Sequence, residues 1–452
     1  MSCSIDGVEL PAAEGSGILA RLRSWWQGES LSRQFWIFFT AAFFFDFGIG
    51  LYFFLFNLFL LNLHFDERMM GFATGALTLG NVVGTIPVGF LARRYGLQRL
   101  LLFCFIASPI LSILRTLVVW TPAQIGLAFL TGMALSCWPV CFAPVVAGLT
   151  IEKNRAFAFS IVFATGIGTG TLAGLAGGWI PQLLSHFFGV ARAVDGIRIV
   201  LIAASLFASL GIWPVSRLRL SRTATTGREK RPLFHPFLIR FLPPFAIWSI
   251  VTGSFIPFAP VFFQKQLGIS LQHVGMVFSA SQFAQFSAVL IVPLLFRKAG
   301  SAVQIICVQL VAGAAVFALG MSHSASFAVG WYLAYTAVQF TAGPGFYGLL
   351  MSRVPEADRS SASAVQNVVG ALAGAGSAAL TGSLVVRYGY GLIFHINAIL
   401  AVIAAILVFA CYGFSENLLS LRRLFALLLV SAMRQNLSAR PTDGGGAPIS
   451  GG

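Results

Sequence analysis

The chain has 452 residues, of which 57% are apolar and 10% are charged. Because soluble domains have about 25% charged residues, this composition excludes an ordinary soluble protein and indicates a protein of the lipid bilayer. The formal net charge of +15 does not indicate nucleic-acid binding, since the Lys and Arg residues lie in short loops between apolar segments, where membrane topology places them.

Residues 1–33 are predicted to form a polar cytosolic segment. They contain charges and prolines but lack the continuous apolar core of a signal peptide, so we expect no cleavage. Ile18, Leu22 and Trp25 recur at helical spacing beside Arg21. This pattern is typical of a helix that lies in the headgroup region of a membrane.

Residues 35–63 form the first predicted span, and one carboxylate, Asp46, interrupts it. At about 1.5 Å per residue, Asp46 lies roughly 16 Å from the start of the span, close to the midplane of a hydrocarbon core about 30 Å thick. An ionisable residue there is retained at a cost in free energy, which favours a functional role. Gly50, Phe53 and Asn57 fall within about 40° of Asp46 on a helical wheel, so one face of this helix is polar or small.

The remaining apolar segments predict an all-α membrane protein with twelve transmembrane helices in two groups of six. We expect a first bundle over 34–214, a basic cytosolic loop over 215–236, a second bundle over 237–412, and a cytosolic tail with an amphipathic helix over 413–452. After 35–63, the predicted spans are 69–92, 100–120, 123–149, 156–181, 196–214, 237–267, 273–296, 302–321, 327–351, 360–386 and 391–412.

The basic residues divide unequally between the two sides of the membrane. The side with few of them has Arg68, Arg192, Arg198, Lys265 and Arg387. By the positive-inside bias, the other side is cytosolic and holds the central loop and both termini, as an even number of spans requires. We therefore expect a multi-pass protein of the plasma (inner) membrane.

A constant offset of 204 residues relates the two halves of the chain. Gly96 in the segment GFLARRYG matches Gly300 in the segment PLLFRKAG. The same offset aligns Gly71 with Gly275, Asn81 with Gln285, Arg93 with Arg297, Arg155 with Arg359, and Gly166, Gly170 and Gly178 with Gly370, Gly374 and Gly382. Two six-helix repeats are the architecture of a transporter whose site lies between the halves.

The chain resembles the major facilitator superfamily over roughly residues 34–412. The segment GFLARRYGLQR, with Gly89, Arg93, Arg94, Gly96 and Arg99, is similar to that family's gating-loop motif between spans two and three. Arg93 stands where the family usually has an acid, so the chain departs from the charge relay of its relatives. The resemblance implies that spans one, four, seven and ten line a central cavity and that two, five, eight and eleven form the seams between the halves.

Small and polar residues mark the predicted seam helices. Rows of glycine at i, i+4 let helix backbones approach closely, either as sliding surfaces or as static packing. A related proton-antiporter motif has Gly-Pro in span five where this chain has Gly170 and Thr171, which weakens the case for antiport. The predicted seam residues are Asn81, Gly166, Gly170, Gly174, Gly178, Gln285, Gly370, Gly374 and Gly382.

The predicted coupling and substrate residues are Asp46, Phe53 and Asn57 on span one, Trp138 on span four, Trp248 on span seven and Gln339 on span ten. Burial of a carboxyl group favours its neutral form, which suits a proton carrier, and aromatic rings bind apolar or cationic groups. The alternatives are a structural acid bonded to an amide, and aromatic residues that face lipid. We interpret Arg115, near the end of span three, as a structural residue that reaches the interface by snorkelling.

We therefore predict a secondary transporter that moves a small organic solute by alternating access, with proton-coupled export of a neutral or cationic, partly apolar compound as the favoured form. An uncoupled or symport-type uptake permease is the alternative. A polytopic membrane enzyme is disfavoured, because Asp46 is the only one of the 14 acids in a predicted span. We expect a monomer without cofactor or metal, with the solute, protons and the lipid bilayer as partners.

The predicted orientation can be tested with cysteines introduced at Ser221, in the central loop, and at Gly444, in the tail. Both should resist an impermeant thiol reagent added outside intact cells, because both segments are predicted to be cytosolic. Labelling after permeabilisation serves as the control for reactivity. If both positions are labelled from outside, the orientation is wrong.

Overall fold

The computed structural model describes residues 31–188, 192–220, 236–296, 299–322, 324–355 and 358–413. The predicted interfacial helices within 1–33 and 413–452, and most of the loop 215–236, lie outside the described residues. Within the described ranges, all regular secondary structure is helical. This confirms the predicted all-α class.

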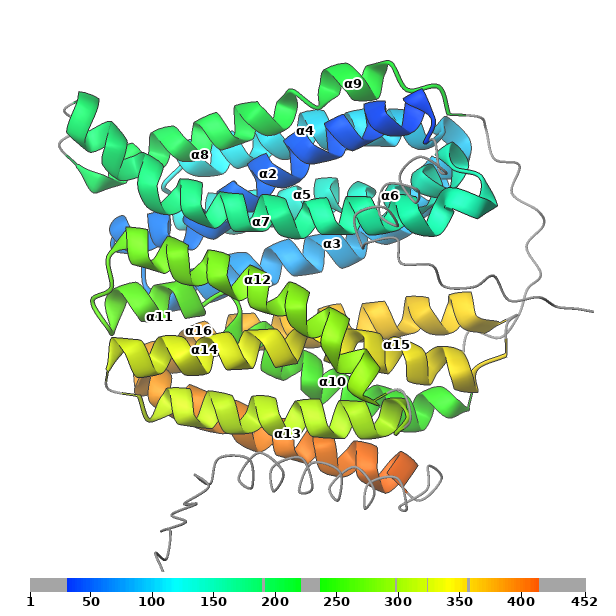
Figure 1. Cartoon of the computed structure of the whole chain (residues 1–452). Coiled ribbons are helices and arrows are strands. Elements are labelled where there is room, and N and C mark those ends of the chain that lie inside the picture. The colour runs from blue at the N-terminus through cyan, green and yellow to red at the C-terminus, as the bar shows by residue number, and fades with distance from the viewer. Residues whose placement is uncertain are drawn as a thin grey trace, which may run out of the picture.

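Two sets of helices follow one another along the chain, and Figure 1 shows them as two layers, with α2–α9 above α10–α16. The first set consists of α2 (Arg33–Asn62), α3 (Glu67–Tyr95), α4 (Leu97–Leu117), α5 (Thr121–Leu135), α6 (Cys137–Leu149), α7 (Glu152–Phe188), α8 (Ala193–Ser209) and α9 (Ile212–Ser216). The second set consists of α10 (Phe237–Phe255), α11 (Ala259–Lys265), α12 (Leu271–Phe296), α13 (Ser301–Gly320), α14 (Ala325–Phe340), α15 (Ala342–Arg353) and α16 (Arg359–Val408), followed by a π-helical turn, η2 (Phe409–Gly413).

Ten segments of the described chain are helical, long and apolar enough to cross a membrane. The sequence predicts twelve, and the difference has two causes. α16 contains two predicted spans, which Gly389 separates with φ 79° and ψ 171°, and the predicted span 327–351, which covers most of α14 and α15, is not among the ten. Each predicted span therefore lies in one helix, in part of α16, or in a pair of helices.

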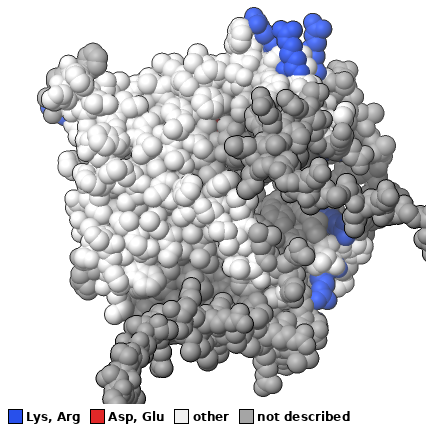
Figure 2. All heavy atoms as spheres, viewed as in Figure 1, with Lys and Arg blue, Asp and Glu red and all other residues white. Residues whose placement is uncertain are grey.

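The outer surface is suited to contact with lipid. Large apolar side chains are exposed along the helices, among them Ile86, Phe187 and Phe283. On the face shown in Figure 2, Lys and Arg gather near α9 and α15, toward one end of the helices, and the broad described area beside them is uncharged. Such an area can lie in hydrocarbon, where an exposed charge is costly.

The two sets of helices meet along two seams, one between α3 and α16 and one between α7 and α12. In the first seam, a methyl group added at Gly71 would collide with the backbone of α16 at Ala378 and Gly382. Only the absence of a side chain lets the two backbones approach so closely. At the offset of 204 residues, the second seam repeats the same contact with Gly275, Gly174 and Gly178.

The offset also relates the two turns that follow α3 and α12. Gly96, before α4, has φ 86° and ψ 156°, and Gly300, before α13, has φ 89° and ψ 161°. A positive φ favours glycine, because a Cβ atom would clash there. The repeat predicted from the sequence is therefore present in the backbone conformation.

We expect Gly275→Ala to destabilise the closed seam, because the added Cβ would have to displace backbone atoms of α7. The matched control is Gly376→Ala in α16, where a methyl group meets nothing within 4 Å and where alanine favours the helix by about 0.5–1 kcal/mol. The melting temperature of the purified protein should fall for Gly275→Ala and stay level or rise for Gly376→Ala. Equal melting temperatures for the two variants would contradict the close approach.

Candidate functional site

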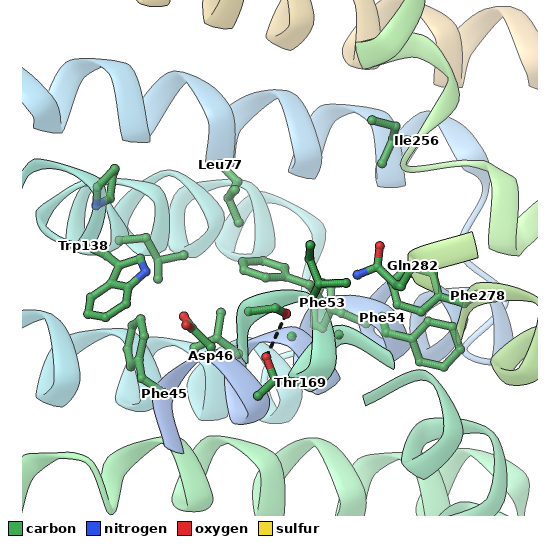
Figure 3. Close-up of a pocket in the computed structure, with 18 of the residues that line it drawn as sticks. Phe45, Asp46, Phe53, Phe54, Leu77, Trp138, Thr169, Ile256, Phe278 and Gln282 are labelled. Carbon is green, nitrogen blue, oxygen red and sulfur yellow. Dashed lines mark hydrogen bonds between the residues drawn. The ribbon is translucent and has the colours of Figure 1, made fainter. Parts of the chain in front are cut away.

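A cavity of about 910 Å³ lies between the two sets of helices. Residues of α2–α7 line it from one side, and residues of the turn between α10 and α11, of α11, of α12 and of α14 line it from the other. Figure 3 shows Asp46, Phe53 and Trp138 of the first set facing the same space as Gln282 of the second. Among the described residues, Asp46 and Arg115 are the only charged ones that line this cavity.

Asp46 reaches the cavity from near the middle of α2. In Figure 3 its carboxylate lies beside Phe45 and Trp138, whose ring centroids are 5.2 Å apart. The carboxylate has no hydrogen bond or ion pair with any residue that the structure describes. It is therefore available to a proton or to a cationic group of a solute.

Aromatic rings and amides form much of the remaining wall. Beyond Asp46, Phe54 of α2 meets Phe278 of α12, with ring centroids 4.8 Å apart. The lining amides are Asn57, Asn81, Gln282 and Gln285. A mostly apolar wall with a few polar groups is typical of sites for partly apolar small molecules.

The predicted coupling and substrate residues fall in two places. Asp46, Phe53, Asn57 and Trp138 line the cavity, whereas Trp248 and Gln339 do not. Trp248 is 5% exposed and belongs to a buried hydrophobic cluster that includes residues of both sets. Phe340, the next residue in the chain, does line the cavity. Gln339 therefore misses the cavity wall by one position on the helix.

The predicted seam residues have three kinds of surroundings. Asn81, Gly166, Gly170 and Gln285 line the cavity. Gly174 and Gly178 contact α12, Gly370 and Gly374 face Phe245 and Ser249 of α10, and Gly382 contacts the backbone of Glu67. The row in α7 is therefore part cavity wall and part seam, and the row in α16 turns partly toward its own half.

The gating-loop motif lies at the junction of α3 and α4. Gly96 forms the turn between the two helices, Arg94 lies over the ring of Tyr95 at 5.5 Å, and Arg99 lies in the first turn of α4. A methyl group at Gly89 would meet nothing within 4 Å. The side chain of Arg93 lies outside the described residues, so the effect of its charge stays a prediction.

The carboxylate of Glu67 joins the two sets of helices at one end of the molecule. Its two oxygens accept hydrogen bonds from Lys265 Nζ at 2.7 and 2.9 Å, and Oε1 also accepts one from the Tyr390 hydroxyl at 2.9 Å. Glu67 is 1% exposed, and both of its partners belong to the second set. We call these three residues the Glu67 cluster.

A second contact closes the cavity on the same side. Asn57 Nδ2 donates to the carbonyl of Pro257, in the turn between α10 and α11, at 2.9 Å. Farther along α7, Gly166 lines the cavity, and a methyl group added there would meet nothing within 4 Å. Among the described residues, the two sets therefore touch at the end of the Glu67 cluster and are separated beside Gly166.

Sequence reasoning did not single out Glu67 and Tyr390 and placed Lys265 only among the basic residues of the less basic side. Lys265 lies 198 residues from Glu67, and Tyr390 lies 323 residues from it. A span drawn from 69 excluded Glu67, whereas α3 begins at that residue. One signal pointed here: Lys265 is among the few basic residues on its side of the membrane.

Comparison with known proteins gives one family. A family model described as Major Facilitator Superfamily matches residues 38–378. No curated protein sequence matches the chain.

Several solved structures share the fold. The crystal structure of the nucleoside transporter NupG has a TM-score of 0.69 and 16% identity, and the match covers 84% of this chain and 99% of that one. A bacterial homologue of the human lysosomal transporter Spinster, in an inward-facing and unoccupied conformation, has a TM-score of 0.68 and 15% identity, covering 84% and 96%. A D-xylose-proton symporter has a TM-score of 0.65 and 17% identity, covering 83% and 96%.

We expect Lys265→Ala or Tyr390→Phe to weaken the closed end, because each leaves the buried Glu67 carboxylate with fewer hydrogen bonds. Each should lower the free energy of unfolding by about 1–2 kcal/mol, a value reduced for Lys265 by its partial exposure. The two losses should not add, since both act on one carboxylate. Chemical denaturation of the single and double variants measures this.

Arg68→Ala is the matched control, because Arg68 neighbours Glu67 and lies over the ring of Phe72 at 5.7 Å. It should change the free energy of unfolding little. If the double variant loses the sum of the two single losses, the shared carboxylate does not couple Lys265 to Tyr390.

Proposed function

Because the chain belongs to the major facilitator superfamily and is therefore a multi-pass membrane transporter and not an enzyme, we propose that it couples the movement of a partly apolar organic solute to protons through Asp46. The observation that carries this proposal is the position of Asp46. It is the one acid on the wall of the cavity between the halves, and it has no partner among the described residues.

The chemistry of the wall supports a neutral or cationic solute. A carboxyl group kept from water favours its neutral form, so it can take up a proton on one side of the membrane and release it on the other. Trp138 and Phe45 beside it offer ring faces to an apolar or cationic group. A solute cation and a proton would then compete for the same carboxylate, which couples their movements.

Export is the direction we propose, and the closed end supports it. Lys265 of the Glu67 cluster belongs to the side with few basic residues, so the positive-inside bias places that end outside the cell. The cavity would then open toward the cytosol, the side from which an exporter binds its solute. Uptake by symport is the competing direction.

Asp46→Asn keeps the shape of the side chain and removes the titratable proton. We expect the variant to lose solute accumulation driven by a pH gradient, while a solute without a cationic group still binds and exchanges without a gradient. One proton crossing 100 mV carries about 2.3 kcal/mol, enough for roughly a fifty-fold gradient of a neutral solute in one-to-one exchange. Gradient-driven flux in proteoliposomes, equilibrium binding and melting temperature, measured on one preparation, check this.

Asp195→Asn is the matched control, since Asp195 pairs with Arg198 at 3.5 Å and does not line the cavity. It should transport as the unaltered protein does. Loss of solute binding in Asp46→Asn would instead assign the acid to a solute cation alone, and a large fall in melting temperature would assign it to the fold. Unchanged gradient-driven transport would sink the coupling role.

A further inference from the structure

Arg115 lies on the wall of the same cavity, and its position differs from the snorkelling expected from the sequence. It occupies the last turn of α4 and is 2% exposed. The guanidinium carbon lies 4.1 Å from the centroid of the Phe56 ring on α2. The side chain therefore turns into the protein and toward the cavity instead of reaching the membrane surface.

The guanidinium has donors without acceptors. Nε and Nη1 of Arg115 are buried and have no hydrogen-bond partner, and no carboxylate among the described residues pairs with the side chain. The nearby hydroxyl groups of Tyr52 and Thr116 both donate to the carbonyl of Ser112, at 3.0 and 2.9 Å, and neither accepts a hydrogen bond from Nε or Nη1. The Gln124 amide donates to the carbonyls of Arg115 and Val118 and so stabilises the end of α4.

Burial of a cation without a partner is unfavourable unless something compensates for its lost hydration. The ring of Phe56 offsets part of this cost, and the C-terminal end of α4 favours a positive charge. Neither accepts a hydrogen bond from Nε or Nη1. Nε and Nη1 each form, together with Nη2, a planar pair of N–H donors, and such a pair matches the two oxygens of a carboxylate.

We propose that Arg115 is an anion-binding subsite of the transport cavity and holds a carboxylate-type group of the solute. This inference rests on the proposed function and narrows its solute class. Phe56 lies ten residues from Asp46 on α2, which is about 15 Å along the helix axis. The apolar body of the solute would lie along the aromatic side chains between Arg115 and Asp46. A solute that is neutral overall would then be zwitterionic, with its carboxylate at Arg115 and its cationic end at Asp46.

Phenylbutyrate, its uncharged amide phenylbutyramide, and acetate separate the contributions of charge and apolar body. Each is added at millimolar concentration to the purified protein, and the shift in melting temperature reports binding. We expect phenylbutyrate to bind at least about tenfold more tightly than the amide, since hydrogen bonds to a charged group are stronger than those to a neutral one. Acetate should bind more weakly than phenylbutyrate, because it lacks the apolar body.

Arg115→Gln should remove the preference for phenylbutyrate over the amide, and Arg115→Lys, which keeps the charge but not the fork, should retain part of it. Arg198→Gln is the matched control: Arg198 also lies over a ring, Phe59, at 5.6 Å, but does not line the cavity, so the preference should persist. Equal binding of phenylbutyrate and amide by the unaltered protein overturns the proposal, even if Arg115→Gln does not fold. If acetate shifts the melting temperature as much as phenylbutyrate does, the site accepts any small anion, and the assignment of a partly apolar solute is overturned.

These equilibrium measurements need no gradient, so they separate the subsite from the coupling role. Asp46→Asn should keep the preference for phenylbutyrate over phenylbutyramide. If it does and gradient-driven transport is also unchanged, the proposed coupling fails while the anion subsite stands. If the preference is absent and Asp46→Asn abolishes gradient-driven accumulation, the subsite fails while the coupling stands.

Discussion

The close approach of helix backbones at glycine is the constraint on which the rest of the structure depends. Gly382 of α16 touches the backbone of Glu67 at the start of α3, and this contact brings the Glu67 carboxylate within hydrogen-bond distance of Lys265 and Tyr390. A side chain at Gly382 would hold the two helices apart, and the bonds across the halves could not form. Contact at this end and separation beside Gly166 together define the cavity. The seam therefore determines both where the halves join and where the cavity lies between them.

The frame is symmetric, but its chemistry is not. The two seams use equivalent glycines, and the turns at Gly96 and Gly300 have nearly the same backbone angles. At the same offset of 204 residues, Asp46 corresponds to Ile250, Glu67 to Leu271 and Arg115 to Leu319. Repeated packing serves both halves, because each half contributes one helix to each seam. A charge that binds a proton or a solute is needed only once, and a second copy would add the cost of burying another ion.

The sequence predicted the features that the bilayer and the repeat impose. Apolar length predicted the spans, the offset of 204 residues predicted the equivalent seams, and the rarity of acids within spans drew attention to Asp46. What it could not predict depends on how each helix is rotated about its axis, which only packing decides. Rotation of α14 leaves Phe340 on the cavity wall beside Gln339, and the direction of α4 turns Arg115 inward. The Glu67 cluster could not be predicted, because none of its residues belongs to a distinctive sequence pattern. Lys265 and Tyr390 lie 198 and 323 residues from Glu67 in the chain.

The presence of one acid and one base on the cavity wall has an electrical consequence. With Asp46 and Arg115 both ionised, their formal charges cancel, and the membrane potential exerts no net force on the empty cavity as the halves reorient. One proton on Asp46 leaves a net positive charge, and a potential of 100 mV then biases the reorientation by up to about 2.3 kcal/mol. A carboxylate bound at Arg115 cancels that charge again. Voltage therefore acts on every form in which the charges of Asp46, Arg115 and a bound solute do not cancel. The protonated, empty carrier is one such form, and the resting potential of the cell would bias its return.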